Sequence, residues 1–364
     1  MKNKYVRIFL IILIGILTII SIKFENIILF LSAIIMYVAL IITKIISIYK
    51  LKKDKKMPSV SLIIVNIIFF IGLGCFLSVM KDIFILKGAS KRGNFKSVRI
   101  NEKEIERHGG DFKYAEYILQ LKEAASPFTK QSDSIKFENK YYEFLTIMHE
   151  PKKYTKKILV ITSVHGDEPA GALSIPLLLK DITDNPTFYQ NTAICIVSPL
   201  NPVGLAKTSR ENGNGCNINR DFELKTQKET NYIIKVIDVF KPNLVLDIHE
   251  NHGEFKTCLF ANPKVADSFG EIICKDLSKK TIELESEPQG MNDNIMIPNG
   301  WSKQSTYERF LKDLVGYGDL NGYGNSNNIA VIALECDQSQ SIEKRKSICL
   351  STVKAVINNI KQLN

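Results

Sequence analysis

Three long apolar stretches, separated by short polar connections, dominate the beginning of the chain. They cover about residues 6–22, 27–48 and 59–80, and each is long enough to cross a bilayer as a helix. A cleaved signal peptide is not indicated, because no small-residue cleavage site follows the first stretch and two more stretches come after it. Buried core helices are the alternative, but a soluble core has no place for so much uninterrupted Ile and Leu. The pattern therefore predicts three transmembrane helices.

Beyond about residue 110, short apolar or alternating runs are interleaved with runs of helical periodicity. Strands are predicted at 141–149, 157–164, 192–199, 243–248, 257–262, 281–285 and 329–335, and helices at 169–184, 228–240, 264–279, 304–314 and about 341–361. The first two strands, joined by a turn, are expected to form a hairpin. The alternation predicts an α/β fold with a mixed, mostly parallel sheet and helices on both faces.

The pattern divides the chain into three parts. Residues 1–80 form the predicted membrane domain, residues 81–110 a polar linker, and residues 111–364 a catalytic domain long enough for one sizeable core. Six of the seven cysteines lie in the last part, at spacings that do not indicate a disulfide scaffold and do not reveal any pairing.

Basic residues are placed where they orient the membrane domain. The chain carries 48 Lys and Arg against 38 Asp and Glu, a net charge of +10, yet residues 1–90 alone hold 12 bases and 3 acids. The amino terminus and the loop at 50–56 hold most of these bases and are expected to be cytoplasmic, which places the catalytic domain outside the cell membrane. The excess positive charge lies in the predicted membrane domain and indicates how that domain is oriented. It therefore does not support a nucleic-acid partner.

The most informative local sequence, His165-Gly166-Asp167-Glu168, directly follows a predicted strand. It presents an imidazole and a carboxylate three residues apart, which is half of a zinc site. His249 and Glu335 also end predicted strands. Since sites gather where the strands of such sheets end, these side chains are expected to meet.

A catalytic zinc ion takes three protein ligands and keeps one position for water. If His165 and Glu168 supply two, the third comes from one of the remaining histidines, which are His108, His149, His249 and His252. The first two lie in the polar linker and beside a turn. His249 ends a buried strand and His252 lies one turn beyond it, so the residues alone leave both as candidates.

Two further motifs lie between these segments, namely Asn201-Pro202-Val203-Gly204 and the run from Arg210 to Phe222. In order, the segments resemble the zinc metallocarboxypeptidase family (the carboxypeptidase A-like superfamily), which shares H-x-x-E, N-P-x-G, R-x-N-x-x-G-x-x-x-N-R-x-F, a strand-end His and a late Glu. The resemblance covers about residues 110–364. It is greatest to the murein peptide amidase branch, which trims peptidoglycan peptides.

The resemblance implies that His165, Glu168 and His249 bind one Zn²⁺ per chain. Asp247 lies two residues before His249 and shares its face of the strand, so it is placed to orient that ligand. The family usually has an acid where this chain has Asn217. A neutral amide still accepts a hydrogen bond from imidazole, so weaker zinc binding is expected rather than loss of the site.

The resemblance also implies catalytic and substrate-binding roles. Glu335 would be the general base that takes a proton from the attacking water and passes it to the leaving nitrogen. Arg210 would stabilise the oxyanion, and Asn219 and Arg220 would bind the substrate carboxylate. A family tyrosine in the loop before Glu335 corresponds to Tyr317 or Tyr323, between which the sequence does not choose.

The leading hypothesis is a multi-pass membrane protein whose outward-facing zinc carboxypeptidase or amidase domain removes a terminal residue from a peptide with a free carboxylate. Cell-wall peptides are the expected substrates, because an anchored domain would face the wall. An alternative is an N-acyl amino acid deacylase of the related succinylglutamate desuccinylase and aspartoacylase type. A binding domain that has lost catalysis is a third hypothesis, although no ligand and no base is missing.

Overall fold

The computed structural model describes residues 112–252, 256–286, 298–303 and 318–363. All of them belong to one compact unit, which comprises residues 90–309 and 317–364. The three predicted transmembrane stretches, the linker, the predicted helix at 304–314 and Tyr317 lie outside the described residues. Within the described ranges, no helix combines the length and the apolar character that crossing a membrane requires.

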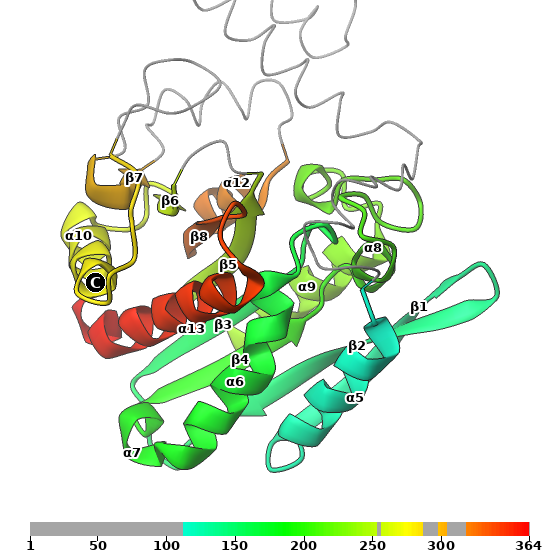
Figure 1. Cartoon of the computed structure of the whole chain (residues 1–364), viewed down its shortest axis with the longest axis horizontal. Coiled ribbons are helices and arrows are strands. Elements are labelled where there is room, and N and C mark those ends of the chain that lie inside the picture. The colour runs from blue at the N-terminus through cyan, green and yellow to red at the C-terminus, as the bar shows by residue number, and fades with distance from the viewer. Residues whose placement is uncertain (1–111, 253–255, 287–297, 304–317, 364) are drawn as a thin grey trace, which may run out of the picture. The chain divides into compact units, whose positions relative to one another are not determined.

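An eight-stranded mixed sheet forms the centre of the domain, in the order β1-β2-β4-β3-β5-β8-β6-β7 (Figure 1). The strands are β1 (Thr129–Phe137), β2 (Lys140–His149), β3 (Lys156–Thr162), β4 (Thr192–Ser198), β5 (Leu244–Asn251), β6 (Cys258–Ala261), β7 (Trp301–Lys303) and β8 (Ala330–Asp337). The pairs β4–β3, β3–β5, β5–β8 and β6–β7 are parallel, and the other three are antiparallel. The predicted mixed, mostly parallel sheet is confirmed.

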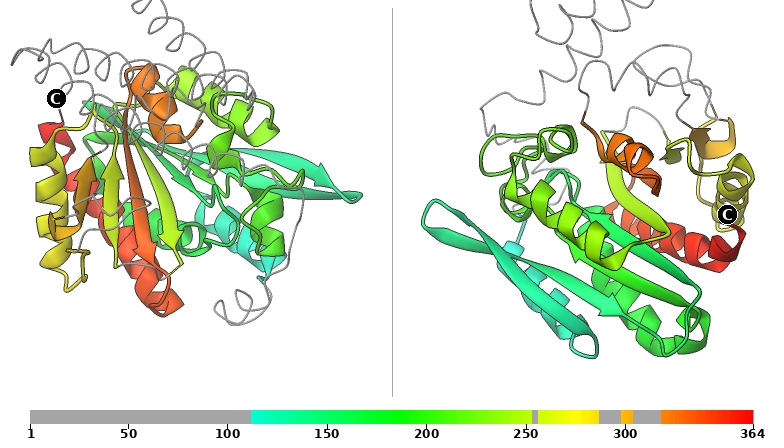
Figure 2. Two further views of the ribbon diagram at one scale, coloured as in Figure 1. Left: turned by 90° about the horizontal axis from the view of Figure 1, so that it is seen from above. Right: turned by 180° about the vertical axis from the view of Figure 1, so that it is seen from behind.

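Helices cover both faces of the sheet, as predicted (Figures 1 and 2). One face packs against α5 (Tyr114–Ala124), α6 (Ala170–Asp184), α10 (Asp267–Ser278) and α13 (Ile342–Asn359). The other face packs against α9 (Lys228–Phe240) and α12 (Leu320–Ser326). Shorter elements are α7 (Pro186–Tyr189), α8 (Pro202–Lys207), η1 (Ile218–Arg220), η2 (Pro298–Gly300) and η3 (Ile360–Gln362).

The central strands are buried on both faces, which explains their continuous apolar sequences. In β5, Leu244 and Leu246 face the core beneath α6 and α13, whereas Val245 faces the core beneath α9. Since side chains alternate along a strand, Asp247 and His249 share the face of Val245. The polar end of this strand therefore projects on the α9 side of the sheet, where the strand stops.

The predicted hairpin between residues 141–149 and 157–164 is wrong. Strand β4 lies between β2 and β3, and the hairpin partner of β2 is β1. The sequence did not predict β1 because this edge strand is polar and mostly exposed, without apolar alternation. It also did not predict α5. The predicted strand at 281–285 is reduced to a single bridge between Thr257 and Leu284.

Two backbone segments touch where Gly166 meets the first turn of α8. The Gly166 N–H donates to the Ser209 carbonyl over 2.9 Å. A Cβ at residue 166 would lie only 1.9 Å from the Gly204 carbonyl carbon. The Asn201 side chain accepts the Gly204 N–H at 2.8 Å and fixes the same turn. The His-Gly-Asp-Glu turn and the Asn-Pro-Val-Gly turn are therefore packed directly backbone to backbone.

We expect Gly166→Ala to lower the free energy of unfolding by about 3 kcal/mol or more, because rigid backbone cannot move away from the new methyl group. Urea denaturation of the full-length chain in detergent, followed by the fluorescence of its single tryptophan, measures this. Gly213→Ala is the matched control, since its Cβ would meet the ring of Phe137, a half-buried side chain that can shift, at 2.8 Å. Equal losses in the two variants would contradict the backbone contact.

Candidate metal centre and active site

The turn after β3 brings the first two predicted ligands together. Ser163 has a left-handed φ of 52° and turns the chain sharply at the end of the strand. The His165 Nδ1 atom then lies 2.7 Å from Glu168 Oε1, and both side chains are buried. The H-x-x-E motif thus forms a compact pair between β3 and α6.

The end of β5 brings His249 to the other oxygen of the same carboxylate. Its Nδ1 atom lies 2.8 Å from Glu168 Oε2. One potential ligand atom from each of His165, Glu168 and His249 lies within 4.8 Å of the others, the sole such group of three in the described ranges. Two imidazole nitrogens that converge on one carboxylate form a donor set of the kind that binds catalytic zinc.

The structure separates His249 from the other histidine candidates. The His252 Nδ1 atom faces Gln338 Oε1 at 3.2 Å, and its Nε2 atom lies 3.7 Å from Asp167. His149 faces the Tyr189 carbonyl, away from the cluster. Neither belongs to the ligand group, and His108 lies outside the described residues.

The remaining ring nitrogen of each histidine has its own polar partner. His165 Nε2 lies 3.1 Å from Asn217 Oδ1, and His249 Nε2 lies 2.8 Å from Asp247 Oδ2. If each Nε2–H donates to that oxygen, the Nδ1 lone pair points at the cluster and is free to bind a metal ion. The two histidines differ, because one partner is a neutral amide and the other a carboxylate.

The charges of this cluster affect its pKa values in opposite directions. Burial, helped by the positive charge of Arg210, lowers the pKa of His165 to about 3. Burial acts to lower the pKa of His249 too, but the Asp247 and Glu168 carboxylates outweigh it and hold that pKa well above its usual value. Burial opposes ionisation of Glu168, yet the two imidazoles keep its pKa well below the usual range. Because a histidine binds a metal ion only through an unprotonated nitrogen, acid competes with metal binding at such a cluster.

Glu335 lies beside His249, at the end of the adjacent strand. The two residues are register partners in the parallel pair β5–β8, so their side chains project on the same face. Burial, reinforced by the charge of Glu168 and opposed by that of His249, raises the pKa of Glu335 to about 7. A partly exposed carboxyl group with this pKa can accept and release a proton at neutral pH.

Arg210 completes the charged part of the site. Its Nη1 atom donates to Glu168 Oε1 over 3.1 Å, and its side chain is about a third exposed, at 35%. The guanidinium therefore lies next to the candidate ligands and still reaches solvent, as expected of a group that meets substrate.

The predicted carboxylate-binding pair lies on η1, two and three residues after Asn217. Asn219 Oδ1 accepts the backbone N–H of Leu320 over 3.1 Å, and Arg220 Nη1 donates to the Asn219 carbonyl over 2.6 Å. Asn219 therefore also fixes the segment that leads into α12. The buried Phe222 anchors the other side of η1.

The two tyrosine candidates are only partly described. Tyr323 packs with its ring centre 6.0 Å from that of Phe222, beneath Lys225 Nζ at 5.6 Å from the ring centre. These contacts give Tyr323 a packing role, and Tyr317 lies outside the described residues.

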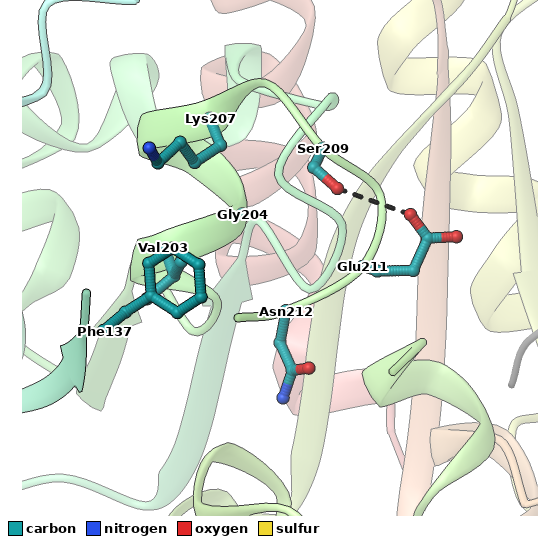
Figure 3. A pocket seen from close by; sticks show the side chains of 7 residues that line it. All are labelled: Phe137, Val203, Gly204, Lys207, Ser209, Glu211 and Asn212. Atoms are coloured by element: carbon teal, nitrogen blue, oxygen red, sulfur yellow. Dashed lines mark hydrogen bonds between the residues drawn. The ribbon is translucent and has the colours of Figure 1, made fainter. Parts of the chain in front are cut away.

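A shallow pocket lies beside this site and contains none of its predicted ligands (Figure 3). It is lined by Phe137, Val203, Gly204, Lys207, Ser209, Glu211 and Asn212. Figure 3 shows Phe137 and Val203 on one side of the pocket and Ser209 and Glu211 on the other, and Ser209 Oγ donates to Glu211 Oε2 over 3.3 Å. The pocket lies between β1, α8 and the loop at residues 208–217 that holds Arg210, which we call the arginine loop.

Sequence reasoning missed Glu250 and Arg345. The Glu250 backbone N–H donates to Glu168 Oε2 over 3.2 Å, and the Glu250 side chain forms an ion pair with Arg345. Neither residue was singled out, because Glu250 follows the predicted strand at 243–248, Arg345 lies within the predicted helix at about 341–361, and no local signal marks either residue as buried.

The segment that holds most of the site matches a known enzyme family. Residues 154–278, about a third of the chain, match the Succinylglutamate desuccinylase/Aspartoacylase catalytic domain. This match includes the three candidate ligands, Arg210 and η1, but it ends before Glu335. No curated protein matches the chain in sequence.

Solved structures share the fold at low sequence identity. A candidate metallopeptidase from Shewanella denitrificans gives a TM-score of 0.55 at 15% identity, over 68% of this chain and 91% of that one. A metallo-carboxypeptidase from Burkholderia cenocepacia gives 0.50 at 13% identity, over 70% of each chain. At these identities the likeness concerns the fold alone.

The domain has a zinc carboxypeptidase-like fold, and the segment with the buried His165-Glu168-His249 cluster matches the catalytic domain of a hydrolase family. The match of residues 154–278 agrees with the predicted relation to succinylglutamate desuccinylase and aspartoacylase, and the solved structures agree with the predicted carboxypeptidase-like fold.

We expect Asn217→Asp to strengthen metal binding by about 10-fold or more, because a carboxylate on His165 Nε2 makes its Nδ1 a better donor. Titration of the metal-free, full-length chain with Zn²⁺ against a competing chelator measures the change. Asn214→Asp is the matched control, since it adds the same charge at an exposed position of the same loop. A similar gain in both variants would show a general charge effect and would contradict a specific effect through His165.

Proposed function

We propose that this protein is a zinc-dependent hydrolase that cleaves an amide bond next to a substrate carboxylate, with terminal peptide bonds as its substrates. The position of Glu335 beside His249, in register on the adjacent strand, is the observation that carries the proposal. It places a proton-accepting group next to three candidate ligands, which is the arrangement that metal-assisted hydrolysis requires.

His165, Glu168 and His249 would hold the zinc ion. When bound, Zn²⁺ supplies a Lewis acid that polarises the scissile carbonyl and makes water a stronger nucleophile at neutral pH. Asp247 and Asn217 keep the two imidazole rings oriented through their Nε2 atoms. These contacts fix the ligand set before any substrate arrives.

Glu335 would accept the proton of the attacking water at a carboxylate oxygen and deliver it to the leaving nitrogen. Arg210 would stabilise the negative charge that develops on the carbonyl oxygen, because its guanidinium lies next to the cluster and remains accessible. Arg220, with Asn219, would bind the free carboxylate of the substrate, for which a planar guanidinium is well suited.

Peptides are the leading substrate class because the Asn201–Gly204 motif and the spacing from Arg210 to Asn219 resemble the peptidases. One specific observation favours a second candidate, an N-acyl amino acid deacylase. The family that residues 154–278 match is that of succinylglutamate desuccinylase and aspartoacylase. Both reactions break an amide bond near a carboxylate and use the same groups.

We expect Glu335→Gln to lower turnover by about 10²–10⁴-fold, because the amide cannot accept a proton, while metal content stays unchanged. The test incubates the zinc-loaded, full-length chain in detergent with muropeptides, control peptides, N-succinylglutamate and N-acetylaspartate, and identifies products by mass spectrometry. Glu283→Gln, at an exposed position, is the control.

The products decide between the two candidates. Zinc-dependent release of a terminal residue from a peptide, absent in Glu335→Gln, supports the peptidase. Release of succinate or acetate alone would support the deacylase. Bound metal without any cleavage would contradict both and favour a binding domain.

Membrane anchoring by residues 1–80, with the catalytic domain outside the cell membrane, is a further part of the proposal. The three apolar stretches and the basic residues around the first of them and before the third support it. Protease added to intact cells should remove an epitope tag at residue 364 but spare a tag at the amino terminus. Protection of the carboxyl-terminal tag until the cells are lysed would contradict this orientation.

A further inference from the structure

A buried ion pair links the C-terminal helix to the candidate metal centre. Arg345 of α13 donates through Nη1 to Glu250 Oε1 over 2.6 Å, and the two side chains are 1% and 0% exposed. The desolvation of two charges opposes folding, so their attraction contributes little net stability in such a position. Stability alone therefore does not account for the pair.

Glu250 contacts the segment that carries the candidate ligand Glu168 at two points. Its backbone N–H donates to Glu168 Oε2 over 3.2 Å. Its side-chain Oε2 accepts the backbone N–H of Ala170, the first residue of α6, over 2.7 Å. Since Ala170 lies two residues after Glu168 and Glu250 directly follows His249, one side chain fixes both ligand segments relative to each other.

The start of the C-terminal segment contacts the same turn at a second point. Gln338, one residue after β8, donates through Nε2 to the Asp167 carbonyl over 2.8 Å. This contact fixes the residue before Glu168 relative to the strand that carries Glu335. Arg345 and Gln338 thus connect the base strand and its following helix to the ligand turn.

We propose that Arg345 is a positioning residue for the metal centre, which acts by holding the Glu250 carboxylate against the first turn of α6. The inference rests on the proposed metal site. The guanidinium fixes one carboxylate oxygen, so that the other stays directed at the Ala170 N–H and the Glu250 backbone stays directed at Glu168. Without it, the buried carboxylate would turn away from the Ala170 N–H, and the spacing between Glu168 and His249 would loosen.

The test measures metal binding by the full-length chain in detergent. Arg345→Met is expected to weaken Zn²⁺ binding by about 10–100-fold, the range found when groups that orient metal ligands are removed. The visible absorption of bound Co²⁺, which reports ligand geometry, should change as well. Val353→Ala in the same helix is the matched control, because it removes buried apolar contacts and should lower thermal stability without changing metal affinity or the Co²⁺ spectrum.

A double variant separates the effect of the Glu250 side-chain position from the effect of burying an unpaired charge. In Glu250→Gln with Arg345→Met no uncompensated charge is buried, but nothing fixes the residue 250 side chain against Ala170, so metal affinity should stay as low as in Arg345→Met. Full recovery would show that the buried charge, and not the position of the side chain, caused the loss, and would overturn the inference. If Arg345→Met does not fold, Arg345→Lys replaces it. Its flexible ammonium group should fix the carboxylate less tightly and weaken binding several-fold.

Three other results would overturn the inference. Metal affinity and a Co²⁺ spectrum equal to those of the unaltered chain, in Arg345→Met or its Lys replacement, would leave the ion pair a purely structural role. An equal loss of affinity in Val353→Ala would show that general destabilisation is the cause. An unaltered chain that binds no metal would overturn both this inference and the proposed function.

Discussion

The arrangement of the whole site depends on the buried carboxylate of Glu168. Its two oxygens face the Nδ1 atoms of His165 and His249, and they also accept hydrogen bonds from Arg210 and from the Glu250 backbone. A buried carboxylate is unfavourable unless it is paired and hydrogen-bonded, so this one residue requires the ends of β3 and β5, the arginine loop and the start of α6 to meet. The parallel alignment of β3, β5 and β8 makes that meeting possible.

The polar groups around the cluster have two roles: some orient the histidine rings, and others fix the backbone of the turn that carries Glu168. Asn217 and Asp247 fix ring orientations, while Glu250 and Gln338 fix the backbone of the ligand turn. Such outer contacts make a site rigid before a ligand arrives, which lowers the free-energy cost of binding.

Much of the site could be predicted from local sequence, because its residues end apolar strands and stand at fixed spacings. The apolar runs of β3, β5 and β8 mark buried strands. His165 lies three residues after β3, and His249 and Glu335 lie two residues before the ends of β5 and β8. Strand order could not be predicted, because the insertion of β4 between β2 and β3 depends on pairing over long sequence distances. The polar strand β1 lacks a pattern, and Arg345 is indistinguishable from a surface residue without knowledge of what packs against its helix.

The position of β8 inside the sheet affects how the protein is made. Among the described strands it is the last in chain order, yet it lies between β5 and β6, and α13 follows it. A nascent chain can pair β3, β4 and β5 early, but it lacks Glu335 and Arg345 until β8 and α13 have left the ribosome. The groups around Glu168 can therefore come together only after β8 has entered the sheet between two strands that were made before it.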